Sequence, residues 1–326
     1  MSGKYILLIL FIVISSSLFS GESLIPDTSN VGFDSTKFWK LTGTTSLTFN
    51  QIAFSDWAKG GENSFSGKTS SNYKYNYKKK NIIIQNTISL AFGLNWTEQN
   101  KFRKTEDKFN FNSLYGINAL ENWYYSFMLG LKTQFANGYK YPNDSTLISQ
   151  FFAPGYISTS LGMEYKPRDF LSVFISPASG KFTFVLNEEL ANKGSYGVKP
   201  AEVDETTGEI IKHGEKVNPE FGINLIFNFQ KEVVKNINIM SIFNLYNNYL
   251  DDEIENRWNL DLDWETNIDF SINKHFSTIF YLHMIYDHDV IIPDYDYVNG
   301  KYTKVGEKGP RLQIQQSFGV GLSLKL

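Results

Sequence analysis

The stretch Arg311 to Leu326 reads RLQIQQSFGVGLSLKL, and from Leu312 onward every second residue is apolar with one interruption. Alternate side chains of a β-strand point to opposite faces, so this stretch predicts a strand with one apolar and one polar face. The apolar row, which we expect to face lipid, consists of Leu312, Ile314, Phe318, Val320, Leu322, Leu324 and Leu326. Such a strand is typical of the closing strand of an outer-membrane β-barrel, whose polar row faces an enclosed lumen. Gln316 interrupts the row, and it is either a polar residue facing lipid or the sign of a β-bulge before Phe318.

The composition of the 326 residues excludes several classes of protein. Hydrophobic residues make up 42% and aromatic residues 16%, whereas charged residues make up only 20%. This balance differs from that of a disordered chain or a coiled coil. The formal net charge of -3 gives no electrostatic reason to expect nucleic acid as a partner. Because the chain has 0 Cys, we expect neither a disulfide framework nor a lipoprotein anchor.

The first residues have the pattern of a secretory signal peptide. Lys4 precedes an apolar run from Tyr5 to Ile14, and small residues follow up to Gly21. The run is too short to span a bilayer comfortably, which favours a cleaved signal over an anchor. We predict a signal peptide over residues 1–20, with Ser17 as an alternative end, and a flexible periplasmic leader over residues 21–38. The barrel is predicted over residues 39–326.

From Trp39 onward, apolar and polar residues alternate through most of the chain. A period of two over segments this long predicts strands that can cross a membrane while tilted. The predicted strands cover residues 39–54, 65–77, 82–96, 109–119, 123–135, 156–165, 170–185, 221–229, 237–245, 258–270, 276–288 and 311–326. We therefore expect about twelve strands, within a range of roughly ten to fourteen, in an all-β, antiparallel up-and-down barrel.

The connections between these segments alternate between long and short. The long polar links are 55–63, 97–108, 136–155, 186–219, 246–257 and 289–310, and the tight ones are 78–81, 120–122, 166–169, 230–236 and 271–275. An outer-membrane barrel keeps short turns on the periplasmic side and long loops outside, so both termini are expected in the periplasm. The dipeptides Thr207-Gly208 and Asn299-Gly300 predict hairpins within two of the long loops.

Aromatic residues recur near the predicted ends of strands, where the headgroups of a membrane would lie. The expected periplasmic girdle contains Trp39, Tyr77, Trp123, Tyr165 and Phe276, and Trp96 and Trp258 belong to the outer one. Aromatic rings suit this level because each combines an apolar body with a polar edge.

Four carboxylates share one face of the predicted strand 258–270: Asp261, Asp263, Glu265 and Asp269. Carboxylates are unfavourable against lipid, so we predict that this row lines the lumen. As bases facing the row we expect Lys68, Lys74, Arg311 and Lys325, which lie on strands near the barrel closure. Two interpretations stay open: ion pairs and amide hydrogen bonds close the lumen, or the acidic row lines a cation-preferring pathway.

The sequence indicates no catalytic, cofactor or metal site. His283 and His288 fall on opposite faces of one predicted strand and therefore cannot share a metal ion. A lipid-modifying hydrolase would need a serine close to one of them, and the sequence indicates none. The acidic clusters of the outer loops are interpreted as solvated, with divalent ions shared with lipopolysaccharide as the alternative.

Three segments also resemble a known group of proteins. They are FNQIAFSDWAKGGENSFS (Phe49 to Ser66), ISPASGKFTFV (Ile175 to Val185) and NLYNNYLD (Asn244 to Asp251). These segments resemble a family of bacterial outer-membrane β-barrel proteins classed as a domain of unknown function. The resemblance extends over nearly all of the chain after the predicted signal, and Trp57, Gly60 and Gly61 are its most specific part. It implies a location and an architecture, and it carries over no catalytic residue.

These observations together predict an integral protein of the cell outer membrane. Its expected partners are outer-membrane lipid, lipopolysaccharide and, during insertion, the barrel-assembly machinery. The leading hypothesis is porin-like or transporter-like passage of small solutes through a polar lumen. The alternative is a structural or surface-interaction barrel with a plugged lumen, and a lipid-modifying enzyme is the least favoured class. No cofactor is expected.

Overall fold

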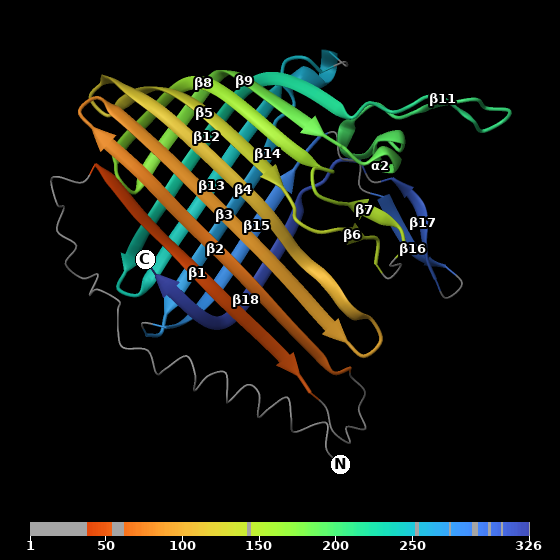
Figure 1. Ribbon diagram of the computed structural model, residues 1–326, viewed down its shortest axis with the longest axis horizontal. Helices are drawn as coiled ribbons and strands as arrows, with labels where there is room; N and C mark the ends of the chain where they lie inside the picture. Colours follow the sequence, from red (N-terminus) through yellow and green to blue (C-terminus); the bar gives the residue numbers. More distant parts are fainter. Residues whose placement is uncertain are drawn as a thin grey trace. The chain divides into compact units, whose positions relative to one another are not determined.

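The alternating segments pair into a closed antiparallel β-barrel of twelve strands, which confirms the predicted fold class (Figure 1). The computed structural model describes residues 38–53, 62–141, 145–251, 254–273, 275–288, 293–298, 301–307 and 309–325. Residues Trp39–Lys325 form one unit, which contains the barrel and its loops. The predicted signal peptide, most of the leader, Trp57, Gly60, Gly61 and Leu326 lie outside the described residues.

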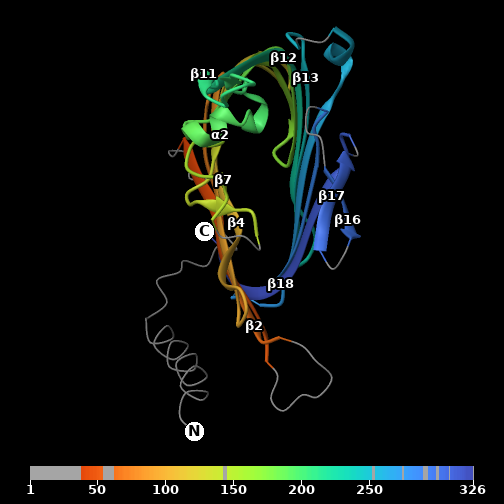
Figure 2. The same ribbon diagram turned by 90° about the vertical axis from the view of Figure 1, so that its right-hand side faces the viewer.

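Around the barrel the strand order is β1-β18-β15-β14-β13-β12-β9-β8-β5-β4-β3-β2. The barrel strands are β1 (Trp39–Ile52), β2 (Ser64–Lys79), β3 (Ile82–Thr97), β4 (Lys101–Leu120), β5 (Trp123–Thr133), β8 (Gly155–Arg168), β9 (Leu171–Phe184), β12 (Val217–Val234), β13 (Ile237–Asn248), β14 (Asp261–Ser271), β15 (Phe276–Tyr286) and β18 (Gln313–Lys325). The smaller elements of the long loops lie on the right-hand side of Figure 1, and Figure 2 views the molecule from that side.

The two faces of the strands differ in exposure as the alternation predicts. On β1 the inward-facing Ser46 is buried, whereas Leu41 on the opposite parity is exposed. On β18 the apolar row is highly exposed, with Ile314 at 61%, Phe318 at 70% and Leu324 at 57%. The same holds for Leu312, Val320 and Leu322. The apolar side chains of this barrel therefore point out from the wall, the reverse of a water-soluble β-protein.

Gln316 stays on the outward row of β18. The pairing of β18 with β15 runs from Gln313↔Ile285 to Leu322↔Phe276 with no register shift, so the alternative of a bulge before Phe318 is wrong. Gln316 lies opposite Leu282 and is exposed. The polar interruption of the apolar row is therefore a feature of the outer face of the barrel.

The strand β4 begins earlier than predicted. Residues 97–108 were expected to form a long loop, but β3 and β4 are joined by a turn at residues 98–100, and β4 starts at Lys101. Its first residues read KFRKTEDK, which carries charges on both faces and therefore lacks the alternation that predicts a strand. A register shift next to Thr105 also switches the faces within this segment.

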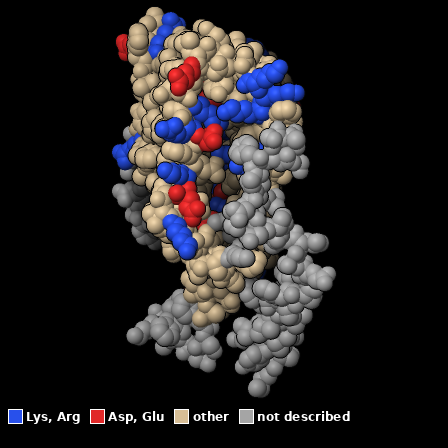
Figure 3. Space-filling view, turned by 90° about the vertical axis from the view of Figure 1, so that its left-hand side faces the viewer, with Lys and Arg blue, Asp and Glu red and all other residues tan. Residues whose placement is uncertain are grey.

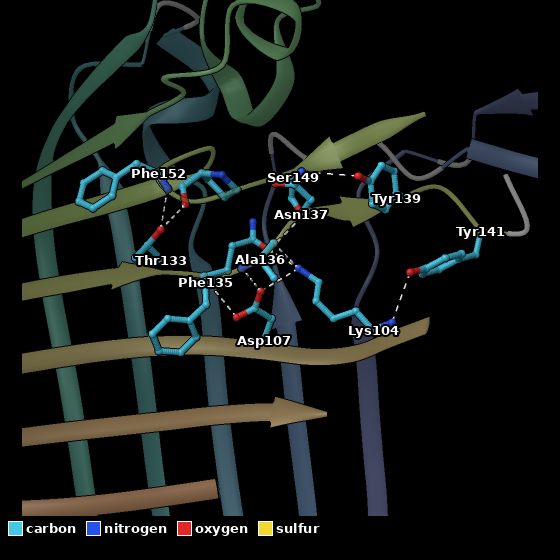
Figure 4. A network of polar contacts seen from close by, with 12 residues as sticks. Lys104, Asp107, Thr133, Phe135, Ala136, Asn137, Tyr139, Tyr141, Ser149 and Phe152 are labelled. Atoms are coloured by element: carbon cyan, nitrogen blue, oxygen red, sulfur yellow. Dashed lines mark hydrogen bonds and ion pairs between the residues drawn. The ribbon is translucent and has the colours of Figure 1, made fainter. Parts of the chain in front are cut away.

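The end of β4 that begins at Lys101 is covered by the chain that follows β5. The Asp107 carboxylate accepts hydrogen bonds from the backbone N–H groups of Phe135 and Ala136, each at 2.8 Å, and from Lys104 Nζ at 2.8 Å (Figure 4). Lys104 Nζ also donates to the carbonyl of Ala136 at 2.7 Å. This network explains how charged residues on the outward face of β4 are satisfied.

The long loops contain small elements of their own. These are β6 (Gly138–Tyr139), β7 (Leu147–Ser149), α2 (Glu188–Asn192), η2 (Ser195–Gly197), β10 (Glu202–Val203), β11 (Ile210–Lys212), η3 (Ile254–Trp258), β16 (Pro293–Val298) and β17 (Lys301–Glu307). The β10–β11 and β16–β17 pairs confirm the two predicted hairpins. Ala153, Val185, Leu190, Ala191 and Val198 form a buried apolar cluster among the loops. Tyr196 Oη donates to the carbonyl of Ile148 at 2.6 Å. Among the described residues, no helix combines the length and the apolar character needed to cross a membrane.

Candidate functional site

The acidic row of β14 meets basic side chains from other strands inside the barrel. Asp263 Oδ2 accepts from Lys132 Nζ on β5 at 2.8 Å, and Asp263 Oδ1 lies 2.8 Å from His283 Nε2 on β15. Glu265 pairs with Lys108 on β4. The side chains of Lys108, Glu265 and His283 are 17% to 20% exposed, so these charges face one another more than they face solvent.

The Lys108–Glu265 pair joins opposite walls of the barrel. In the twelve-strand order, β4 and β14 lie six positions apart in either direction, which is half of the circumference. The β5 strand, which carries Lys132, lies five positions from β14. Side chains from facing walls can form an ion pair only where the lumen is narrow, so the acidic row and its bases obstruct the lumen at this level.

The end of the barrel with the tight turns is obstructed by a second set of contacts. Lys74 on β2 donates to Gln230 on β12, and these strands also lie six positions apart. Gln85 Nε2 donates to both carboxylate oxygens of Glu164, at 2.9 and 3.2 Å. An apolar cluster lies nearby, formed by residues of β3, β4, β5 and β9: Ile83, Leu114, Met128 and Phe174, with Tyr124 and Ile226 packed against it.

The bases expected opposite the acidic row have other positions. Lys68 pairs with Glu106 at 2.5 Å and lies over the Tyr281 ring, 4.8 Å from its centroid. Lys74 contacts Gln230, and Arg311 is exposed just before β18 begins. The partners of Asp263 and Glu265 are instead Lys132 and Lys108.

Two of the residues in this site escaped the sequence reasoning for a local reason. Lys108 was placed in the predicted loop 97–108, and Lys132, although it lies within the predicted strand 123–135, was not considered as a partner of the acidic row. Both share the inward parity of their strands with small or polar residues such as Asn112 and Gly130. That parity was the signal that could have found them.

The other two carboxylates of the acidic row have local partners. Asp261 accepts from the backbone N–H of His288 at 3.2 Å, and Asp269 accepts from Ser271 Oγ at 3.3 Å.

Asp263, Glu265 and His283 also form a group whose potential ligand atoms lie within 4.8 Å of one another. Carboxylate and imidazole are ligands that suit several divalent metals. Both carboxylates, however, already accept from lysine ammonium groups, and a bound cation would have to displace them. Among the hydrogen bonds of the described residues, the His283 ring contacts Asp263, and no serine contacts the ring of His283 or His288.

Between the acidic row and the seam of β1 with β18 lies a cavity of about 510 Å³. Its polar lining is made mainly of hydroxyl and amide groups together with the two ion pairs, and includes Lys68, Glu106, Lys108, Glu265, Asn72 and Ser89. Such a lining can hydrogen-bond a small polar group from several sides. On the face drawn in Figure 3, basic and acidic side chains are interspersed.

The chain forms a closed barrel with apolar side chains outside and paired charges inside. This is the architecture of a bacterial outer-membrane β-barrel protein. Residues 49–139 match the model of a family described as "Protein of unknown function (DUF3078)", which confirms the predicted resemblance to an uncharacterised family over that part of the chain. No curated protein matches the chain.

Several solved structures of bacterial outer-membrane proteins resemble it at low identity. An outer membrane channel from Pseudomonas putida F1 matches with a TM-score of 0.38 and 8% identity, over 88% of this chain and 94% of that one. The translocator domain of the autotransporter NalP from Neisseria meningitidis matches with a TM-score of 0.30 and 9% identity, over 95% and 92% of the two chains.

Proposed function

We propose that this chain is an integral outer-membrane β-barrel that admits a small polar or amphiphilic molecule into its lumen, and that ion pairs hold the pathway shut in the state described here. The observation that carries the proposal is the Lys108–Glu265 pair between strands on opposite sides of the barrel. A freely open porin would keep such side chains apart, with water between them.

The proposed membrane location is supported by the outer face. A contiguous exposed apolar surface of this extent is unfavourable in water and favourable in hydrocarbon. Aromatic pairs lie at the end of the barrel with the tight turns. The ring centroids of the stacked Trp39 and Tyr75 are 4.3 Å apart, and those of Trp123 and Tyr165 are 4.8 Å apart. These pairs have the position and chemistry of an interfacial girdle.

The proposal is tested by ion conductance in planar bilayers. The variant replaces both pairs at the acidic row with alanine: Lys108, Glu265, Lys132 and Asp263. The backbone ladder is unchanged, and each lysine is removed together with its carboxylate, so neither a lysine nor a carboxylate of these pairs is left alone. The His283 ring loses its contact with Asp263 in this variant. We expect low conductance from the wild type and a clear increase from the variant.

A matched control is the exposed ion pair of α2, Glu189 with Lys193, in which both side chains are more than half exposed. Replacing these two residues with alanine should leave the conductance at the wild-type value. Open-porin conductance from the wild-type protein would contradict the closed lumen. A quadruple variant that migrates as a folded barrel but conducts no better than wild type would show that the pairs do not close the pathway.

A second candidate function, the surface-interaction barrel with a plugged lumen, is supported by the outer loops. The buried cluster of Ala153, Val185, Leu190, Ala191 and Val198 gives these loops a packed core, which presents the β10–β11 ribbon as an ordered element. Deletion of residues 202–212 should then abolish attachment to lipopolysaccharide-containing vesicles and leave conductance unchanged. Unchanged attachment would count against this function.

A further inference from the structure

The seam between the first and last barrel strands is closed over only part of its length. β1 pairs with β18 at five register positions, from Thr44↔Lys325 to Thr48↔Gly321. On its other side, β1 pairs with β2 from Trp39 to Ile52, and β18 pairs with β15 from Gln313 to Leu322. In the described residues, β18 from Gln313 to Val320 is therefore paired on one side only. Figure 1 shows β1 and β18 diverging from their paired stretch.

The lumenal cavity borders this part of the wall. In a closed sheet, only one parity of a strand faces the lumen, because successive side chains alternate between the two faces. Both parities of β18 line the cavity, namely Gln315, Ser317 and Gly319 together with Gln316 and Phe318. On β1 the inward Thr48 and Asn50 line it together with the outward Phe49. The lining includes five consecutive residues of β18, Gln315 to Gly319, and this run is paired with β15 alone, so the cavity borders an unpaired strand edge here.

Exposure of the inward row supports the same geometry. Gln313, Gln315 and Ser317 have the inward parity of β18 and are nevertheless exposed. On the neighbouring β15, which is paired on both sides, the inward Ser277 and Tyr281 are only 1% and 6% exposed. The difference follows from the missing strand partner on the β1 side.

The lining of the opening is apolar in part and charged in part. The lining includes the exposed rings of Phe49 and Phe318 and two ion pairs whose side chains are mostly covered, Lys68–Glu106 at 2.5 Å and Lys108–Glu265. These four charges sum to zero. A net anion or cation entering this cavity would leave an uncompensated charge in a confined space, whereas a zwitterion can exchange partners with both pairs.

We propose that the seam between β1 and β18 is a lateral portal, through which the zwitterionic head of a membrane phospholipid enters the lumenal cavity while its acyl chains stay in the bilayer. The inference rests on the proposed outer-membrane location. It explains Gln316, since an amide on the outward row is favourable where that row borders a polar opening rather than lipid.

The absence of cysteine from the sequence makes a direct test simple, because one introduced thiol is the only site of labelling. A bimane fluorophore is attached to single-cysteine variants of three residues: Phe318 on the outward row, Ser317 on the inward row at the portal, and Ser158 on the inward row of β8, which is paired on both sides at this position and lies outside the cavity lining. Each protein is reconstituted in vesicles of phosphatidylcholine with brominated acyl chains, which quench bimane on contact.

We expect Ser317→Cys to lose emission to an extent of the same order as Phe318→Cys, while Ser158→Cys keeps its emission. If Phe318→Cys also keeps its emission, the membrane location itself fails. If Phe318→Cys is quenched but Ser317→Cys behaves like Ser158→Cys, the barrel is in the membrane and only the portal is overturned.

The head-group part of the proposal has its own control. Vesicles of brominated phosphatidylglycerol, which is anionic, should quench Ser317→Cys less than brominated phosphatidylcholine does. Replacing Lys68 with Met and Glu106 with Gln should remove this preference. The same change at the Lys181–Glu220 pair, at 3.0 Å and outside the cavity lining, should preserve it. Equal quenching by both lipids in the otherwise unchanged protein would overturn selection of a zwitterion.

Discussion

The closed part of the seam depends on a close approach of β18 to β1 at Gly321. A Cβ atom added to Gly321 would lie 2.2 Å from the carbonyl oxygen of Leu47. Relief of this overlap requires the strands to separate by about 1 Å, which weakens the hydrogen bonds next to the substitution. Two weakened bonds at about 1 kcal/mol each, more where the groups face hydrocarbon, predict that Gly321→Ala lowers the free energy of unfolding by about 2 to 4 kcal/mol.

Gly319 provides a matched control on the same face of the same strand. A Cβ atom there would lie 3.5 Å from Thr48 Cβ, which is ordinary van der Waals contact. Gly319→Ala should therefore change the free energy of unfolding by less than about 0.5 kcal/mol. The measurement is urea unfolding in phospholipid vesicles. The folded fraction at each urea concentration is read from gels, on which a folded barrel and its heat-unfolded form migrate differently. If the two variants were equally stable, the close approach of β1 and β18 at Gly321 would not be what holds the five paired positions of the seam together.

Three further outcomes are expected. Replacing Phe318 and Leu326 with Asp should prevent membrane assembly, because each carboxylate costs about 1 to 3 kcal/mol against lipid; a heat-modifiable barrel from this variant would contradict the assignment of that face. Asp263→Asn should lower the free energy of unfolding by about 1 to 2 kcal/mol, since it leaves the ammonium of Lys132 without its counter-charge at 2.8 Å, and replacing Lys132 with Met as well should recover most of the loss in urea unfolding. Burial raises the pKa of Tyr196 to about 12, so the phenol stabilises the outer loops below pH 10 and loses this effect as the pH rises through 12; limited proteolysis should show the loops loosening over that range, and Tyr196→Phe should remove the pH dependence.

The barrel itself could be derived from the sequence because its determinants are local. A strand in a lipid-facing barrel must alternate between apolar and polar residues, and this constraint acts on every membrane-crossing segment. The alternation in Ile82–Thr97 and Gln313–Lys325 therefore specified both the strands and their faces. The first residues of β4, from Lys101, carry charges on both faces and do not alternate. The sequence therefore contains no sign of a strand there, and the predicted strand began too late, at residue 109.

The functional geometry depended on distances around the barrel, which no local pattern encodes. The acidic parity of β14 was visible in the sequence, but its partners Lys108 and Lys132 come from strands half or nearly half of the circumference away. Their contact depends on the width of the lumen and on the stagger of the strands. The open stretch of the seam has the same origin, because the register of β1 against β18 follows from closing all twelve strands together. The sequence by itself determined which face of each strand meets lipid, since that choice is made residue by residue. Only the tertiary structure decided which charges meet across the lumen and where the wall stays open, since both are set by the closure of the whole sheet.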